Sequence, residues 1–136
     1  MIVLDASLII ALILREANVP GGGAVYDTLE GETLAVPAHW PAEIGSALAI
    51  NHRRGRISAE NATIAVKKLL VLNPTVDPAP PLGDIPGLLQ FAAAEQLTIY
   101  GAIYVRLAMK LDAMLATMDE AMRVSAKRHD ISLLPS

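Results

Sequence analysis

The sequence predicts an α/β fold in which helices cover both faces of a short parallel sheet of four or five strands. Short runs of branched apolar residues alternate with longer amphipathic stretches, an order typical of strands connected by helices. These runs are apolar throughout, so the strands are expected to be buried on both faces, as in a parallel sheet. A chain of 136 residues is expected to form a single domain, residues 1–136. The prediction is therefore an α/β/α sandwich.

Composition limits the classes of protein to which the chain can belong. Hydrophobic residues make up 53% of it, which is high for a soluble monomer and predicts that a partner covers part of the surface. The longest apolar run, residues 8–14, is too short to cross a bilayer. The lack of cysteine and of a basic N-terminal leader predicts a cytoplasmic protein. A net charge of −3 means that any contact with nucleic acid must come from a local patch.

The first half of the chain is expected to hold two strands and four helices. Ser7 and Ser58 are expected to be N-caps, because each precedes an apolar helical stretch. Residues 18–23 lack the context of a phosphate-binding loop and predict a flexible connection. Ala62, Ala65, Val66 and Leu69 are expected to form the buried stripe of the fourth helix. In order, the expected elements are a strand over 2–4, helices over 8–14 and 24–29, a strand over 34–36, and helices over 38–54 and 59–72.

The second half begins with a proline-rich loop. Residues 73–86 hold five of the nine prolines, which leaves room for a strand of at most two or three residues. The elements expected after this loop are helices over 87–96 and 100–111, a strand over 114–117, a helix over 120–129 and a last strand over 131–134.

Three acidic residues are expected to meet at one edge of this sheet. Asp5 and Asp119 each end a predicted strand, and Glu43 lies in the first turns of the helix after the second strand. Each residue alone is explained as a helix cap or as an acid near a helix start. Together they would repel one another unless a cation neutralised them. Oxygen ligands of this kind suit Mg²⁺ or Mn²⁺.

Four segments of the sequence together carry a family resemblance. They are Val-Leu-Asp-Ala-Ser at 3–7, Pro-Ala-Glu-Ile-Gly-Ser-Ala-Leu at 41–48, Arg-Arg-Gly-Arg-Ile-Ser at 53–58 and Leu-Ala-Thr-Met-Asp at 115–119. In this order, over nearly the whole chain, the sequence resembles the PIN-domain proteins and among them the VapC toxins of toxin–antitoxin pairs. The resemblance implies an endoribonuclease that hydrolyses RNA with Mg²⁺ or Mn²⁺.

The resemblance also implies four acidic positions, three of which are filled here by Asp5, Glu43 and Asp119. Asp5 and Asp119 would hold the metal, and Glu43 would be the general base. The fourth position is Gly101, where the family usually has Asp between flanking tyrosines like those present here. Asp112 lies about three helical turns further on and cannot replace it. We therefore expect weakened activity. Ser7 and Thr117 are the implied hydroxyl-bearing neighbours.

The resemblance, with the apolar surplus, implies two protein partners. One is a second copy of the chain, giving a homodimer. The other is an antitoxin segment in an apolar groove beside the acids, with an Arg that pairs with them. Two alternatives stay open: a non-catalytic PIN fold that binds an antitoxin or RNA, which Gly101 favours, and a related nuclease that acts on DNA.

Other residues are ambiguous at this stage. Arg53, Arg54 and Arg56 could touch RNA phosphates, but cations also belong at a helix end without any ligand. His39 lies four residues before Glu43, yet the intervening Pro41 and the lack of a second histidine nearby make a zinc site a poor interpretation. The remaining expectations are an exposed His52, an exposed His129 and a Trp40 in or beside the core.

Overall fold

The computed structural model describes residues 1–14 and 22–136, and strands and helices alternate along them as the sequence predicts. The strands are β1 (Ile2–Leu4), β2 (Leu34–Pro37), β3 (Thr75–Asp77), β4 (Met114–Ala116) and β5 (Leu133–Leu134). The helices are α1 (Ala6–Ile13), α2 (Gly22–Glu30), α3 (Trp40–Arg53), α4 (Ala59–Leu72), α5 (Ile85–Glu95), α6 (Ile99–Leu111) and α7 (Glu120–Arg128), with a short 3-10 helix η1 (Leu82–Asp84) before α5.

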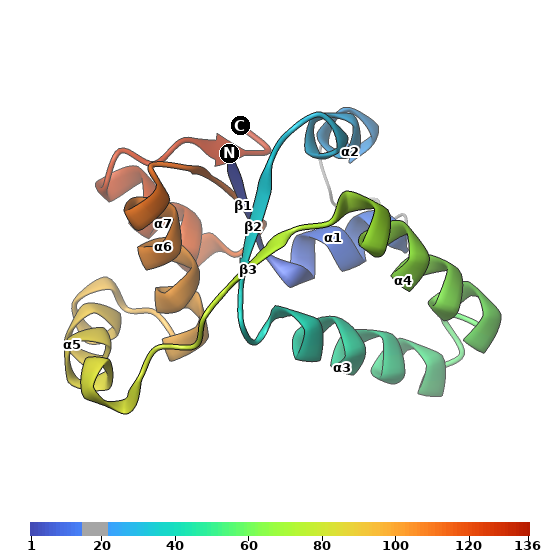
Figure 1. Ribbon diagram of the computed structural model, residues 1–136, viewed down its shortest axis with the longest axis horizontal. Helices are drawn as coiled ribbons and strands as arrows, with labels where there is room; N and C mark the ends of the chain where they lie inside the picture. The colour runs from blue at the N-terminus through green and yellow to red at the C-terminus, as the bar shows by residue number, and fades with distance from the viewer. Residues whose placement is uncertain (15–21) are drawn as a thin grey trace.

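The five strands form one sheet in the order β3-β2-β1-β4-β5, and every neighbouring pair is parallel. In Figure 1 the sheet separates α1, α3 and α4 on one side from α5, α6 and α7 on the other. The predicted α/β/α sandwich is therefore confirmed, and its sheet has five strands. Helices α3 and α4 form a hairpin that extends away from the sheet (Figure 1).

The core is centred on β1, the middle strand. Ile2, Val3 and Leu4 are all 0% exposed, as expected for a strand covered on both faces. Trp40, the single tryptophan, is buried at the start of α3, where it was expected in or beside the core. Within the described part of the chain, no helix is long and apolar enough to cross a membrane.

Several local predictions are wrong. Asp5, not Ser7, is the N-cap of α1, because its carboxylate accepts the backbone N–H of Ser7. Gly22 and Gly23 belong to α2 rather than to the predicted connection, whose residues 18–21 lie outside the described residues. Val66 was expected in the buried stripe of α4 but is 42% exposed, because that helix packs mainly through Ala65 and Leu69.

A charged cluster joins α5 to the end of α7. Glu95 is buried, and its two carboxylate oxygens contact Arg128 Nη1 and His129 Nε2. His129 was expected to be exposed, but this contact and the ring of Phe91, 5.6 Å away between centroids, leave it only partly accessible. The hydrogen bond from His129 and the charge of Arg128 lower the pKa of Glu95 below its ordinary value.

We expect this cluster to make stability depend on pH in the acid range. A carboxyl group with a depressed pKa stabilises the fold above its unfolded pKa of 4.5, and that contribution is lost as pH falls through the folded pKa. Glu95→Gln should therefore unfold at lower urea concentration than the parent at pH 7. The difference should shrink as pH falls below about 4. An equal difference at pH 7 and pH 3 would show that the Glu95 charge contributes nothing.

Candidate functional site

The carboxyl ends of the three central strands meet at one edge of the sheet. Asp5 follows β1, Asp119 comes shortly after β4, and β2 leads into the helix that carries Glu43. Because these strands are parallel and adjacent, their following loops lie side by side. All three carboxylates line one pocket of about 290 Å³. The structure thus brings together the three acids that the sequence singled out.

Asp5 is buried and accepts hydrogen bonds at both carboxylate oxygens. Its Oδ2 accepts the hydroxyls of Ser7 and Thr117, each at 2.7 Å, and its Oδ1 accepts Ser7 N–H at 3.2 Å. These donors fix the orientation of the Asp5 carboxylate in a position that is only 4% exposed. Both hydroxyl-bearing neighbours named in the sequence analysis therefore contact the same carboxylate.

Thr117 connects Asp5 to the second aspartate. Its Oγ1 donates to Asp5 and accepts the backbone N–H of Asp119 at 3.0 Å. Asp119 caps α7, because its Oδ1 accepts Met122 N–H at 2.9 Å. The cap fixes the direction of this carboxylate, and no described residue donates a hydrogen bond to its other oxygen, Oδ2.

Tyr104, on α6, ties Glu43 to the start of α1. Its hydroxyl donates to Glu43 Oε1 at 2.7 Å and accepts the backbone N–H of Ala6 at 3.2 Å. The side chain is 2% exposed, and burial together with the hydrogen bond to Glu43 raises the pKa of Tyr104 above its ordinary value. Tyr104 is therefore a neutral donor that holds one oxygen of Glu43 and leaves Oε2 without a described donor.

His39 also reaches Glu43, which the sequence analysis did not expect. The residue precedes α3 with helical dihedral angles, so Pro41 does not turn its ring away. Its Nε2 lies 3.0 Å from Glu43 Oε1, but the angles do not allow a hydrogen bond between them. The centroid of its ring lies 4.7 Å from that of Tyr100. Burial lowers the pKa of His39, and the charges of Glu43 and Asp5 offset part of this effect.

Gly101 lines the same pocket, in the first turn of α6. Its backbone N–H donates to Oγ1 of Thr98, the N-cap, at 3.0 Å. A Cβ atom at this position would lie 3.3 Å from Thr98 Oγ1 and 3.4 Å from Met122 Cγ. A side chain here therefore requires small shifts of those two neighbours. Asp112, at the other end of α6, is not among the residues lining this pocket.

The donor chemistry of the pocket fits a hard divalent cation that keeps water ligands. Glu43 Oε2 and Asp119 Oδ2 accept no hydrogen bond from the described residues, so both oxygens are free to bind. Within residues 1–14 and 22–136, however, no three His, Cys, Asp or Glu side chains converge closely enough to enclose an ion by themselves. A cation here would therefore need water to complete its shell, which suits Mg²⁺.

A larger hollow, about 670 Å³, lies between α1, α2 and α4. Its described lining is mostly apolar, with Glu30 and Lys68 as its charged side chains. Among the described residues, no group of polar side chains converges there as in the acidic pocket. The acidic pocket is therefore the candidate site, although it is smaller.

Comparison with known proteins bears on the fold. No protein-family model matches the sequence, and no curated protein matches it either. Several solved structures are similar, and two crystal structures among them bear on the fold. PAE2754 from Pyrobaculum aerophilum, a PIN-domain protein, has a TM-score of 0.71 and 26% identity over 97% of this chain and 81% of its own. The chain folds as a PIN domain.

The second similar structure is FitAcB from Neisseria gonorrhoeae, with a TM-score of 0.65. It is 18% identical over 98% of this chain and 96% of its own, and its FitB is a PIN-domain toxin of a toxin–antitoxin pair. At this identity the likeness concerns the fold alone. The predicted resemblance to PIN-domain proteins is thereby confirmed, and the acidic pocket is a feature of this PIN domain's own side chains.

Sequence reasoning misses two residues that contact Glu43. The sequence offers Tyr104 only as one of the tyrosines that flank Gly101, and His39 only as a poor candidate for a zinc ligand. The spacing held a signal for both: Tyr104 lies three residues after Gly101 on one helix face, and His39 lies four residues before Glu43. The contact of Tyr104 with Glu43 cannot be read from spacing alone, because it joins two helices across 61 positions of the sequence.

The double role of Tyr104 predicts a measurable loss of stability when its hydroxyl is removed. Tyr104→Phe leaves the buried N–H of Ala6 without its acceptor, which costs about 1–3 kcal/mol. Urea unfolding should show this loss. The matched control is Tyr100→Phe, because that ring is 59% exposed and the change should stay within about 0.5 kcal/mol. Equal effects of the two substitutions would mean that the hydrogen bonds of Tyr104 do not stabilise the fold.

Proposed function

We propose that this PIN domain is a metal-dependent endoribonuclease of the VapC type, which hydrolyses phosphodiester bonds in RNA. The observation that carries the proposal is the pocket at the carboxyl ends of β1 and β4, lined by Asp5, Glu43 and Asp119. Three carboxylates in one pocket suit a divalent cation and a phosphate group bound to it. The fold shared with a PIN-domain toxin supports the same class of protein.

In this proposal Asp5 and Asp119 hold Mg²⁺ or Mn²⁺, and Glu43 is the general base. The metal, when bound, lowers the pKa of a water molecule and offsets the charge of the attacked phosphate. Glu43 is suited to take a proton because Tyr104 holds its Oε1, while Oε2 accepts no hydrogen bond from any described residue. Ser7 and Thr117 keep the carboxylate of Asp5 in place.

A second candidate is a non-catalytic PIN domain that binds an antitoxin or RNA. Gly101 favours this candidate, because it lines the pocket without a side chain at the position where the resemblance implies a fourth carboxylate. A metal-titrated cleavage assay on total tRNA separates the two candidates, since the binder retains affinity without cleaving.

The proposal includes a protein antitoxin, in keeping with the toxin–antitoxin pair to which FitB belongs. An Arg of the antitoxin would neutralise the carboxylates of the acidic pocket by a bidentate pair, as a metal would neutralise them. The homodimer stays a prediction from the apolar surplus of the sequence, and light scattering on the purified chain measures it.

The carboxylate of Asp5 provides the direct test of the proposed activity. Asp5→Asn removes a charge but keeps an oxygen that can cap α1, so the fold should persist. Cleavage of total tRNA in the presence of Mn²⁺ should fall at least 10- to 100-fold, since even residues that only support a metal ligand have effects of roughly this size.

The matched control is Asp112→Asn. Asp112 is exposed, and its backbone has the left-handed conformation, which Asn also adopts at helix ends. It should cleave RNA as the parent does. If Asp5→Asn retained full activity while its melting temperature was unchanged, the catalytic groups would have to lie elsewhere.

Restoring a carboxylate at position 101 should strengthen the response to metal. In Gly101→Asp, the helix N-terminus favours the new charge by about 0.3–1 kcal/mol, while repulsion from the other acids and the close contacts at Thr98 and Met122 oppose it. The melting temperature without metal should therefore change little. Mn²⁺ should raise it more than in the parent, because tighter binding stabilises the fold by mass action.

RNA cleavage should appear or increase in the same variant. Gly101→Asn is its control, because it adds a side chain of the same shape without the charge. If the parent, Gly101→Asn and Gly101→Asp all responded identically to Mn²⁺, position 101 would not contribute to the metal site.

A further inference from the structure

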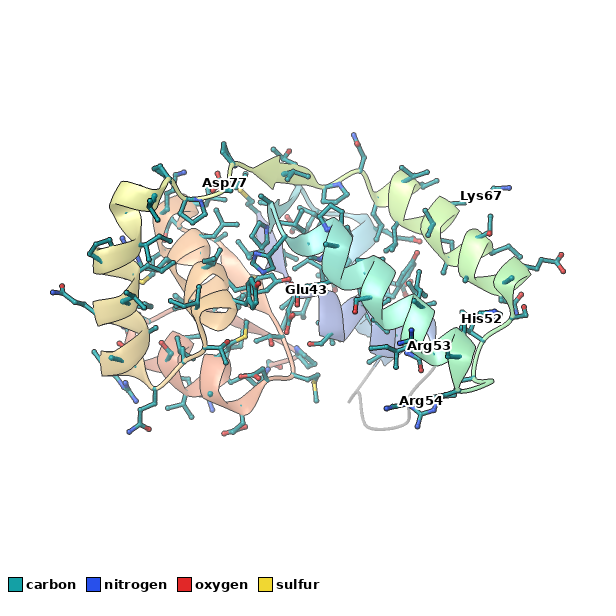
Figure 2. The ribbon with its side chains drawn as sticks, turned by 90° about the horizontal axis from the view of Figure 1, so that it is seen from below. Glu43, His52, Arg53, Arg54, Lys67 and Asp77 are labelled. Carbon is teal, nitrogen blue, oxygen red and sulfur yellow. The ribbon has the colours of Figure 1, made fainter. Side chains whose placement is uncertain are left out.

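The outer end of the α3–α4 hairpin carries a cluster of arginines, here called the basic tip: Arg53, Arg54 and Arg56. These three side chains occupy four consecutive positions of a chain that has eleven Lys and Arg in all. All three are exposed, and within the described part of the chain none forms an ion pair. Figure 2 shows Arg53 and Arg54 at the end of the hairpin, far along α3 from Glu43.

The turn that presents the basic tip is held by backbone hydrogen bonds. Gly55, at φ +71°, donates to His52 C=O at 3.0 Å, and Arg56 N–H donates to Asn51 C=O at 2.9 Å. This pair of bonds is the Schellman arrangement that ends a helix, and it places a residue, here Gly55, in the left-handed conformation. The His52 ring contacts Ile57 C=O at 3.0 Å. The three arginines therefore extend from a fixed backbone.

A helix end alone does not explain this cluster. Arg53 and Arg54 lie where a cation stabilises the helix dipole, but this effect falls off within the last turn. Arg56 comes after the helix has ended and beyond the glycine turn, so it gains little from the dipole. A ligand of opposite charge accounts for all three positions.

Helix α3 connects the basic tip to the acidic pocket. Glu43 is in its first turn and Arg53 is its last residue, so about 15 Å of helix separates them at 1.5 Å per residue. The chain as a whole carries a net charge of −3, and the pocket itself is acidic. A polyanion therefore needs local positive charge to approach the pocket.

We propose that the basic tip binds the phosphate backbone of RNA a few nucleotides away from the bond that lies at the acidic pocket. This inference rests on the proposed ribonuclease function and adds a substrate-binding surface to it. Arginine suits the role because its planar guanidinium can donate two parallel hydrogen bonds to one phosphate. Contacts with the backbone would position RNA without reading its sequence.

The test compares two triple variants by fluorescence anisotropy with a labelled polyuridine RNA. The first replaces Arg53, Arg54 and Arg56 with Gln, and the second replaces Lys67, Lys68 and Lys127, which are exposed on α4 and α7. Both remove three positive charges. EDTA in the buffer excludes cleavage, so binding is measured even if the chain is not a nuclease.

The variant of the basic tip should bind RNA roughly tenfold or more weakly at low salt, whereas the lysine variant should stay close to the parent. The slope of log K against log salt should fall by about 2, since each of three lost contacts with single-stranded RNA contributes about 0.7. Replacing the same three arginines with Lys should keep most of the affinity, because the charge remains. Circular dichroism checks that each variant is folded.

Equal weakening by both Gln variants would overturn the proposal, because net charge alone would then explain binding. Unchanged RNA affinity in the variant of the basic tip would also overturn it, and a loss of binding only to phosphatidylglycerol vesicles would assign the tip to a lipid surface. Failure of the proposed function has a different signature: no Mn²⁺-dependent cleavage by the parent, while RNA binding still depends on the three arginines.

Discussion

The parallel pairing of β1 with both of its neighbours is the constraint on which the acidic pocket depends. Leu4, the last residue of β1, is aligned with Ala116, the last residue of β4. The residues that follow them, Asp5 and Thr117, therefore lie side by side. Thr117 then reaches Asp5 with its hydroxyl and Asp119 through its backbone N–H. A slip of one residue between β1 and β4 would move Asp5 away from Thr117, so the register of this pair fixes the pocket.

Hydrogen bonding divides the carboxylates of the pocket into two kinds. Asp5 has donors at both oxygens and is held in one orientation. Glu43 and Asp119 each have one oxygen held by a described donor and one without such a donor. Fixing half of a carboxylate reduces the side-chain entropy that a ligand must remove when it binds the other half. The hydrogen-bond donors around the three acids therefore indicate which carboxylate oxygens can bind a ligand.

The sequence predicted what is encoded locally. Apolar runs identified the strands, and the acids at strand-to-helix junctions identified the pocket, because a parallel sheet places those junctions at one edge. Contacts between distant segments were not predictable in the same way. Tyr104 reaches Glu43 across 61 positions, and the exposure of Val66 depends on how much of α4 other helices cover. Asp5 replaced Ser7 as the cap because both residues suit that role and their order in the sequence does not decide between them.

The single tryptophan has a practical consequence for work on this protein. Trp40 is the first residue of α3, one position after His39 and three before Glu43, and its indole is 6% exposed. Since the chain has no other tryptophan, all indole emission comes from the first turn of this helix. The intrinsic fluorescence of the unlabelled protein is thus a built-in optical probe of the helix turn that carries Glu43.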